Sequence, residues 1–189
     1  MFENLVKLKL EDISQGMGAA SRHAYFMMLR EADGSRKLSI MVGAYEAQSI
    51  LAFMRKVRVP RPMTHDALLM SLFAYDIGMR EAVIYKVSDG VYYSKIVLIR
   101  DGVVREVEAR TSDAVALALR FDAPVFTYES ILAREHIYES GDGAISIPVS
   151  SVGADVLKEA LRRAISEENY ELAAQLRDEI ARRENQGEV

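Results

Sequence analysis

The chain has 189 residues, half of them hydrophobic, with no cysteine and a formal net charge of −4. This length suits one medium-sized domain with a small appendage, and the lack of cysteine excludes disulfides, thiolate zinc sites and cysteine nucleophiles. No apolar run approaches the roughly 18–20 residues that span a membrane, and the first residues lack the pattern of a signal peptide, so we expect a cytoplasmic protein without membrane contact. The near-neutral composition disfavours nucleic-acid binding unless a local basic groove supplies it.

The first half of the chain predicts strands followed by two helices. Apolar and charged residues alternate from Leu5 to Leu10, as in a half-buried strand, and Asp33-Gly34 is typical of a two-residue hairpin turn between strands. Apolar residues then recur at helical spacing. Strands are expected over 2–11, 22–31 and 36–42, and helices over 44–57 and 65–77.

The second half repeats the Asp-Gly turn signal at 89–90 and 101–102. Three strands joined by such turns predict an antiparallel meander over 80–110. A helix over 112–121, a strand over 124–128 and a helix near 128–137 follow. Because strands and helices come in blocks rather than in strict alternation, the sequence predicts an α+β fold, a largely antiparallel mixed sheet with helices packed on it.

The C-terminal part changes character. Residues 139–153 are rich in Gly, Ser and Pro, which predicts a linker between a domain over 1–138 and a charged, alanine-rich helical segment over 154–185. Two apolar stripes in this segment predict an antiparallel helical hairpin, too small to bury both stripes well by itself. The stripes are Leu157, Leu161, Ala164 and Ile165, and Leu172, Ala173, Leu176 and Ile180.

Three of the expected helices begin with an acidic residue in the first turn: Glu46, Asp66 and Asp113. The starts THDA and TSDA share the pattern T-x-D-A, and an arginine, Arg61 or Arg110, precedes each. An oxygen acceptor at a helix start stabilises the helix by about 1 kcal/mol, and the helix dipole adds about 0.3–1 kcal/mol for a carboxylate. Capping therefore suffices to explain each acid taken alone.

The same three helix starts predict a functional site if they converge. Their carboxylates would hold Mg²⁺ or Mn²⁺, ions that commonly assist phosphodiester hydrolysis, and Arg61 and Arg110 would bind phosphate. His65 would act there as a general base or metal ligand, although a histidine at a helix start, taken singly, more often makes only a local hydrogen bond. The motifs of other common catalytic classes, such as GxSxG, the P-loop and HExxH, do not occur.

Three segments resemble the signature blocks of the bifunctional nuclease domain family: VGAYEAQSI (42–50), RPMTHDALL (61–69) and ARTSDAVALALRFDAPVF (109–126). The resemblance spans about residues 1–138 and departs visibly at Thr111, where many members have proline. It implies DNase and RNase activity, which some members are described as having. The motif residues carried over by position predict catalytic roles for Glu46, His65, Asp66 and Asp113, substrate binding by Arg61, Thr64, Arg110 and Ser112, and a divalent cation on Glu46, Asp66 and Asp113.

The tail segment YELAAQLRDEI (170–180) resembles the UVR domain, whose Leu-Arg-Asp core is here Leu176-Arg177-Asp178. Such hairpins pair with one another through their apolar stripes, so the resemblance implies protein–protein contact. The expected partner is another UVR-type hairpin or a second copy of this chain, which would make a homo-oligomer. The predicted partner-binding residues are Leu172, Leu176, Arg177 and Ile180.

Two functions remain open at this point. One is a metal-dependent nuclease acting on DNA and RNA. The other is a non-enzymatic regulatory or adaptor protein, in which the helix-start acids are caps and the hairpin recruits a partner. The geometry separates them: a cation site needs Glu46, Asp66 and Asp113 within about 8 Å of one another around an open pocket. Carboxylates that are each bound to their own helix or to an arginine favour the second function.

Overall fold

The computed structural model describes residues 4–16, 24–34 and 36–137, and scattered residues between 158 and 181. The chain forms two compact units, Met1–Val87 with Tyr92–Tyr138, and Ser88–Val91 with Glu139–Val189. The predicted linker 139–153 lies outside the described residues. Within the described part of the chain, no helix is long and apolar enough to cross a membrane.

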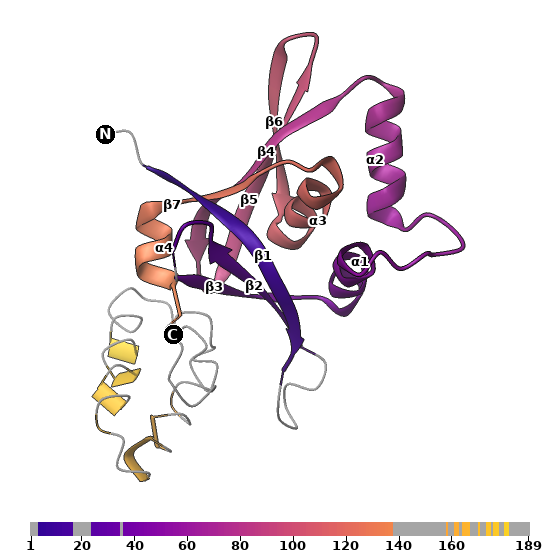
Figure 1. Cartoon of the computed structure of the whole chain (residues 1–189). Coiled ribbons are helices and arrows are strands. Elements are labelled where there is room, and N and C mark those ends of the chain that lie inside the picture. The colour runs from indigo at the N-terminus through magenta and orange to yellow at the C-terminus, as the bar shows by residue number, and fades with distance from the viewer. Residues whose placement is uncertain are drawn as a thin grey trace. The chain divides into compact units, whose positions relative to one another are not determined.

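Strands and helices follow the predicted order along the described part of the chain (Figure 1). The expected α+β fold, with a mostly antiparallel sheet and helices packed on it, is confirmed. The elements are β1 (Leu5–Gln15), β2 (Tyr25–Glu31), β3 (Lys37–Val42), α1 (Ala44–Met54), α2 (Thr64–Ala74), β4 (Gly78–Ser88), β5 (Val91–Arg100), β6 (Val103–Arg110), α3 (Thr111–Phe121), β7 (Val125–Tyr128) and α4 (Glu129–Glu135).

The sheet has seven strands in the order β3-β2-β1-β7-β4-β5-β6. The four-residue strand β7 runs antiparallel to β1 and parallel to β4, so it joins the strands of the first half of the chain to the later meander. The meander itself was predicted, because tight turns specify neighbouring strands. The place of β7 was not, since a short apolar run carries no signal for its partners.

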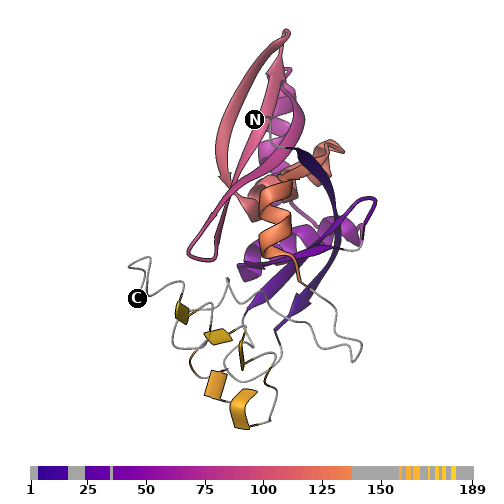
Figure 2. The same ribbon diagram turned by 90° about the vertical axis from the view of Figure 1, so that its left-hand side faces the viewer.

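The Asp-Gly turns have two different outcomes. Asp101 and Gly102 both have positive φ, 50° and 76°, the combination that a two-residue type I′ turn needs, and Figure 2 shows the β5–β6 hairpin that they close at the top of the view. The hairpin predicted around Asp33-Gly34 is confirmed, since β2 and β3 pair antiparallel, but its connection is longer than two residues because β2 ends at Glu31 and β3 begins at Lys37.

Arg36 explains the longer β2–β3 connection. Its Nε and Nη2 donate to the Glu31 carboxylate at 2.9 and 2.8 Å, and its Nη1 donates to Glu129 at the start of α4. These bonds tie the connection to α4, which a two-residue turn would not reach. They also lower the pKa of both Glu31 and Glu129, chiefly through the hydrogen bonds from Arg36.

Helix α3 is the centre of the core. Its buried residues run almost without interruption from Thr111 to Ala118, and both α1 and α2 pack on it. In Figure 1, α3 lies between the β4–β6 strands and the other two helices. The small side chains of Ala114, Ala116 and Ala118 allow close approach on several sides, which brings three helix starts into one region.

Helix α2 is packed on one side only, and His65 is its one fully buried residue. Leu69 and Leu72 contact the core. The expected core face is only partly correct, because Leu68 and Phe73 are 44% and 55% exposed.

The second unit contains a small apolar cluster. Ala164, Ala173 and Leu176 are buried, with Leu161 and Ile180 packed against them, so residues of both predicted stripes meet. Ile165, expected on the first stripe, is exposed. Most of the predicted hairpin lies outside the described residues, and the hairpin stays a prediction.

Candidate functional site

Each of the three helix-start acids is the third residue of its helix, since α1, α2 and α3 begin at Ala44, Thr64 and Thr111. Within the described residues, Asp66 alone caps its helix through the backbone: its Oδ2 accepts the Met63 N–H at 2.9 Å. The carboxylates of Glu46 and Asp113 are engaged elsewhere, so capping explains one of the three acids.

His65 lies between Ser49 of α1 and Asp113 of α3. Its Nδ1 is 2.9 Å from the Ser49 Oγ, and its Nε2 is 3.1 Å from Asp113 Oδ1. Both ring nitrogens therefore have partners, and three helices contribute one member each to this chain of hydrogen bonds.

Arg110, the residue before α3, connects two of the acids. Its Nε donates to Asp113 Oδ2 at 2.8 Å, and its Nη2 lies 2.8 Å from Glu46 Oε1. The hydrogen bond to Asp113, with the charges of both carboxylates, raises the pKa of the Arg110 guanidinium. The side chain is nevertheless 70% exposed, so an incoming anion can reach it.

Arg120 holds the third acid. Its side chain is 2% exposed, and its Nε donates to Asp66 Oδ1 at 2.7 Å. Its Nη2 also donates to Ser49 Oγ at 3.1 Å, and its Nη1 to the carbonyl of Ala116. Burial alone would raise the pKa of Asp66, but the bonds from Arg120 and from the Met63 N–H lower it below its usual 3.8.

Ser49 contacts both His65 and Arg120, whereas Asp113 assigns the tautomer of His65. Because the ionised Asp113 carboxylate can only accept, His65 Nε2 carries a proton and donates it to Asp113. In the neutral imidazole Nδ1 then accepts from the Ser49 hydroxyl, whose oxygen accepts from the Arg120 guanidinium.

The residues do not fit a divalent cation. Among the described residues no three His, Asp or Glu side chains are grouped closely enough to hold a metal ion. Glu46 and Asp113 are bound to Arg110, and Asp66 is bound to Arg120. In this arrangement two guanidinium groups, rather than a cation, neutralise the three carboxylates, and the predicted metal site stays a prediction.

An open pocket of about 410 Å³, which we call the relay pocket, contains most of the predicted site. Its lining residues are Tyr45, Glu46, Ser49, Pro62, Met63, Thr64, His65, Arg110 and Asp113.

Three predicted site residues do not line the relay pocket in the described part of the chain. Asp66 faces Arg120, Ser112 is buried in the first turn of α3, and Arg61 is exposed on the connection between α1 and α2.

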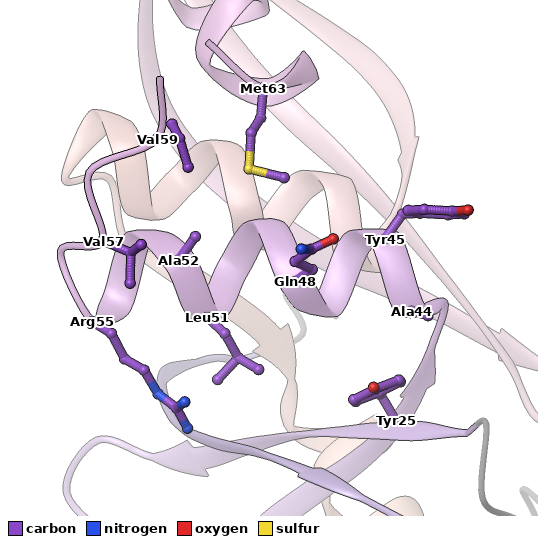
Figure 3. A pocket seen from close by; sticks show the side chains of 10 residues that line it. All are labelled: Tyr25, Ala44, Tyr45, Gln48, Leu51, Ala52, Arg55, Val57, Val59 and Met63. Atoms are coloured by element: carbon purple, nitrogen blue, oxygen red, sulfur yellow. The ribbon is translucent and has the colours of Figure 1, made fainter. Parts of the chain in front are cut away.

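A second, larger pocket of about 650 Å³ lies against the outer side of α1, and we call it the α1 groove. Figure 3 shows Tyr25 and Tyr45 near the N-terminal end of α1 and Arg55 at its C-terminal end. Tyr45 and Met63 line both pockets, so the groove and the relay pocket adjoin.

Sequence reasoning missed Ser49 and Arg120. Both carry a helical signal, because Ser49 is three residues after Glu46 and Arg120 is seven after Asp113, spacings that place each pair on one helix face. It also missed the basic run RKVRVPRP at 55–62, the local basic segment that nucleic-acid binding by a near-neutral chain needs.

The fold and site define an α+β domain whose helix starts meet at a pocket containing histidine, arginine and carboxylates. Residues 27–140, more than half of the chain, match the bifunctional nuclease domain, and the chain belongs to that family. Residues 155–186 match the UvrB/UvrC motif, C-terminal to it.

Two curated relatives have no described function. They are uncharacterized proteins of Mycobacterium tuberculosis, from strains CDC 1551 / Oshkosh and ATCC 25618 / H37Rv. Each is 36% identical over 108 residues, which is 57% of this chain and 64% of the relative. The match therefore spans less than two thirds of either relative.

Proposed function

We propose that this chain hydrolyses phosphodiester bonds of DNA and RNA in the relay pocket. Membership of the bifunctional nuclease domain family supports nuclease chemistry. The observation that carries the assignment to this pocket is the Ser49–His65–Asp113 chain of hydrogen bonds beside the exposed Arg110.

In this proposal each pocket residue has one role. Arg110 binds the substrate phosphate, because a guanidinium offers paired donors that match phosphate oxygens. Asp113 accepts a proton from the attacking water while His65 Nε2–H holds its carboxylate in place, at 3.1 Å. The water oxygen bonds to phosphorus, the bond to the leaving nucleotide oxygen breaks, and that oxygen takes a proton from solvent. Ser49 and Arg120 are positioning residues that hold the His65 ring through its Nδ1.

The divalent cation stays a prediction without a ligand set among the described residues, and no step is assigned to it. Assays with EDTA and with added Mg²⁺ or Mn²⁺ distinguish hydrolysis without a metal ion from hydrolysis that requires one. The proposed roles require activity in EDTA. Strict dependence on either ion would instead favour a cation that displaces the arginine partners of the carboxylates.

The test is digestion of single- and double-stranded DNA and RNA by the full chain, beside His65→Gln and Asp113→Asn. Loss of the proton acceptor in Asp113→Asn should lower the rate by about 10²–10⁴-fold. His65→Gln removes the residue that holds the Asp113 carboxylate and should lower the rate as well. His136→Gln and Asp101→Asn are matched controls, since these residues lie on α4's C-terminal side and in the β5–β6 turn. Substrates left intact under every metal condition, by folded wild-type protein, would refute the proposal.

A specific observation favours a second candidate, the non-enzymatic regulatory or adaptor protein. All three helix-start acids are bound to arginines, as in a network that serves stability. That function predicts no digestion and a bound partner lost on removing residues 154–189. A pulldown with both chain lengths measures it, and a partner retained without the tail counts against it.

The UvrB/UvrC motif supports a protein-contact role for the tail, and we assign it self-association through paired hairpins. Of the predicted contact residues, Leu172 lies outside the described residues. Leu176 is 4% exposed within the apolar cluster of the single chain, Ile180 packs beside it, and Arg177 is exposed. Light scattering on the full chain and on Arg177→Glu tests the assignment, and a wild-type monomer at high concentration contradicts it.

A further inference from the structure

The connection between α1 and α2 is the most basic segment of the described chain. Arg55, Lys56, Arg58 and Arg61 lie there within seven residues, with no acidic residue between Met54 and Met63. All four are exposed, and none of their side chains is hydrogen-bonded or ion-paired to another described residue. We call these four residues the basic connection.

The other described arginines next to the site behave differently. Arg110 and Arg120 are bound to carboxylates, which neutralise much of their positive charge. A chain with a net charge of −4 thus places four cations, which have no carboxylate partner among the described residues, beside the relay pocket and the α1 groove. Such a local field attracts a polyanion, because phosphate neutralisation releases counterions.

The α1 groove adds apolar and aromatic surface beside these cations. Tyr45 is 83% exposed, so one face of its aromatic ring is open to a ligand. Tyr25 lies at the same end of α1, and Arg55, Val57 and Val59 of the connection form the other end (Figure 3). The groove's volume of about 650 Å³ is in the range of pockets that bind small planar ligands.

The relation between the two pockets restricts the ligand further. Because Tyr45 and Met63 line both, a group seated in the α1 groove is adjacent to Arg110 and His65 across those two side chains. The ligand therefore combines a planar, partly apolar group with a neighbouring anionic group, which describes a nucleobase and its phosphodiester.

We infer that the α1 groove binds an unpaired base of a single-stranded nucleic acid, whose backbone runs along the basic connection. Placing the next phosphodiester in the relay pocket rests on the proposed function, but the binding itself does not. An aromatic platform beside a positive groove is the usual way in which proteins bind single strands. A base in a duplex is stacked and paired, and extruding it costs free energy, so single strands bind more tightly.

The experiment measures, by fluorescence anisotropy, how tightly the full chain binds fluorescein-labelled oligothymidylate and a duplex of equal length. All measurements are made in EDTA and with chains that carry His65→Gln. We expect the single strand to bind at least tenfold more tightly than the duplex. Tyr45→Ala should weaken single-strand binding about 5- to 100-fold, the range found when one stacking platform is removed. Tyr75→Ala, an exposed tyrosine at the end of α2, is the control and should change nothing.

The charge contribution is tested by the salt dependence. Removing two phosphate contacts with Arg55→Gln/Arg58→Gln should reduce the slope of log K against log salt by about 1.4, since each single-strand contact contributes about 0.7. Arg105→Gln on β6 removes an exposed cation outside the basic connection and should leave the slope unchanged.

Three results would overturn the inference: equal affinity for single strand and duplex, unchanged binding by Tyr45→Ala, or polyglutamate competing as well as oligothymidylate, which would indicate an acidic peptide. Digestion measured in parallel with the wild-type chain keeps the two proposals apart. Digestion without single-strand preference refutes the inference alone. Single-strand binding with the expected variant effects and no digestion refutes the nuclease alone.

Discussion

The pair between buried Arg120 and partly exposed Asp66 fastens α2 to α3, and Asp66→Ala tests how strongly. The substitution removes the carboxylate 2.7 Å from Arg120 Nε and the acceptor of the Met63 N–H. Breaking a buried pair costs about 3–5 kcal/mol, because the remaining charge is left buried without its partner. Arg120 keeps its bonds to Ser49 and Ala116, so the lower end applies, and loss of the cap adds about 1 kcal/mol.

We therefore expect Asp66→Ala to lower the free energy of unfolding by about 4 kcal/mol. The chain has no tryptophan, so urea unfolding is followed by far-UV circular dichroism. Glu106→Ala, which breaks the exposed Lys95–Glu106 pair, is the matched control and should cost at most about 1 kcal/mol. In the double variant Asp66→Ala/Arg120→Met no unpaired charge is left, so it should lose less than the sum of the two single variants by about 2 kcal/mol.

The pH dependence follows from the lowered pKa of Asp66. Because this pKa is lower in the folded than in the unfolded chain, the stabilisation is complete above the usual value of 3.8 and is lost as the pH falls through the folded value. The wild-type advantage over Asp66→Ala should shrink over that acid range. A loss below about 1 kcal/mol at neutral pH, or strictly additive single variants, would refute the reasoning.

Three further predictions concern residues around α3 and the β5–β6 turn. Thr111→Val should cost about 1–3 kcal/mol in urea unfolding, because it leaves the Tyr92 carbonyl and the Ser94 hydroxyl buried without their partner; a neutral result would contradict those bonds. Tyr92→Phe should be neutral or stabilising in the same measurement, since the buried Tyr92 hydroxyl has no partner among the described residues. Gly102→Ala should lower stability by about 1–2 kcal/mol through its φ of +76° alone, because its Cβ would meet nothing within 4 Å; an unchanged midpoint would show that the turn relaxes.

The element types, the β2–β3 hairpin and the β4–β6 meander were predictable because they depend on local signals. A few neighbouring residues are enough to predict the conformation of the Asp101-Gly102 turn, of the T-x-D-A helix starts and of the apolar helix α3. Asp33-Gly34 shows the limit of such signals, because long-range bonds of Arg36 to Glu129 override the turn preference there.

The candidate site was predictable only in part. Position in the first helical turn identified Glu46, Asp66 and Asp113, but their partners depend on how three helices cross. In the sequence, Arg120 is an ordinary basic residue in the last turn of a helix. Its role in holding Asp66 depends on its burial and on its bonds to Ser49 and Asp66. Conversely, Arg61 matched a motif but stays outside the relay pocket.

The position of β7 has a consequence for the order in which this domain can assemble. β1 to β3 and β4 to β6 can each pair within their own stretch of chain, as hairpins do quickly. In the described sheet, the strand that joins them is β7, whose four residues begin at Val125. On the ribosome, both half-sheets can be present while this joining strand is still unsynthesised, each with an unpaired edge strand. The last short strand of the sheet therefore converts two separate half-sheets into one.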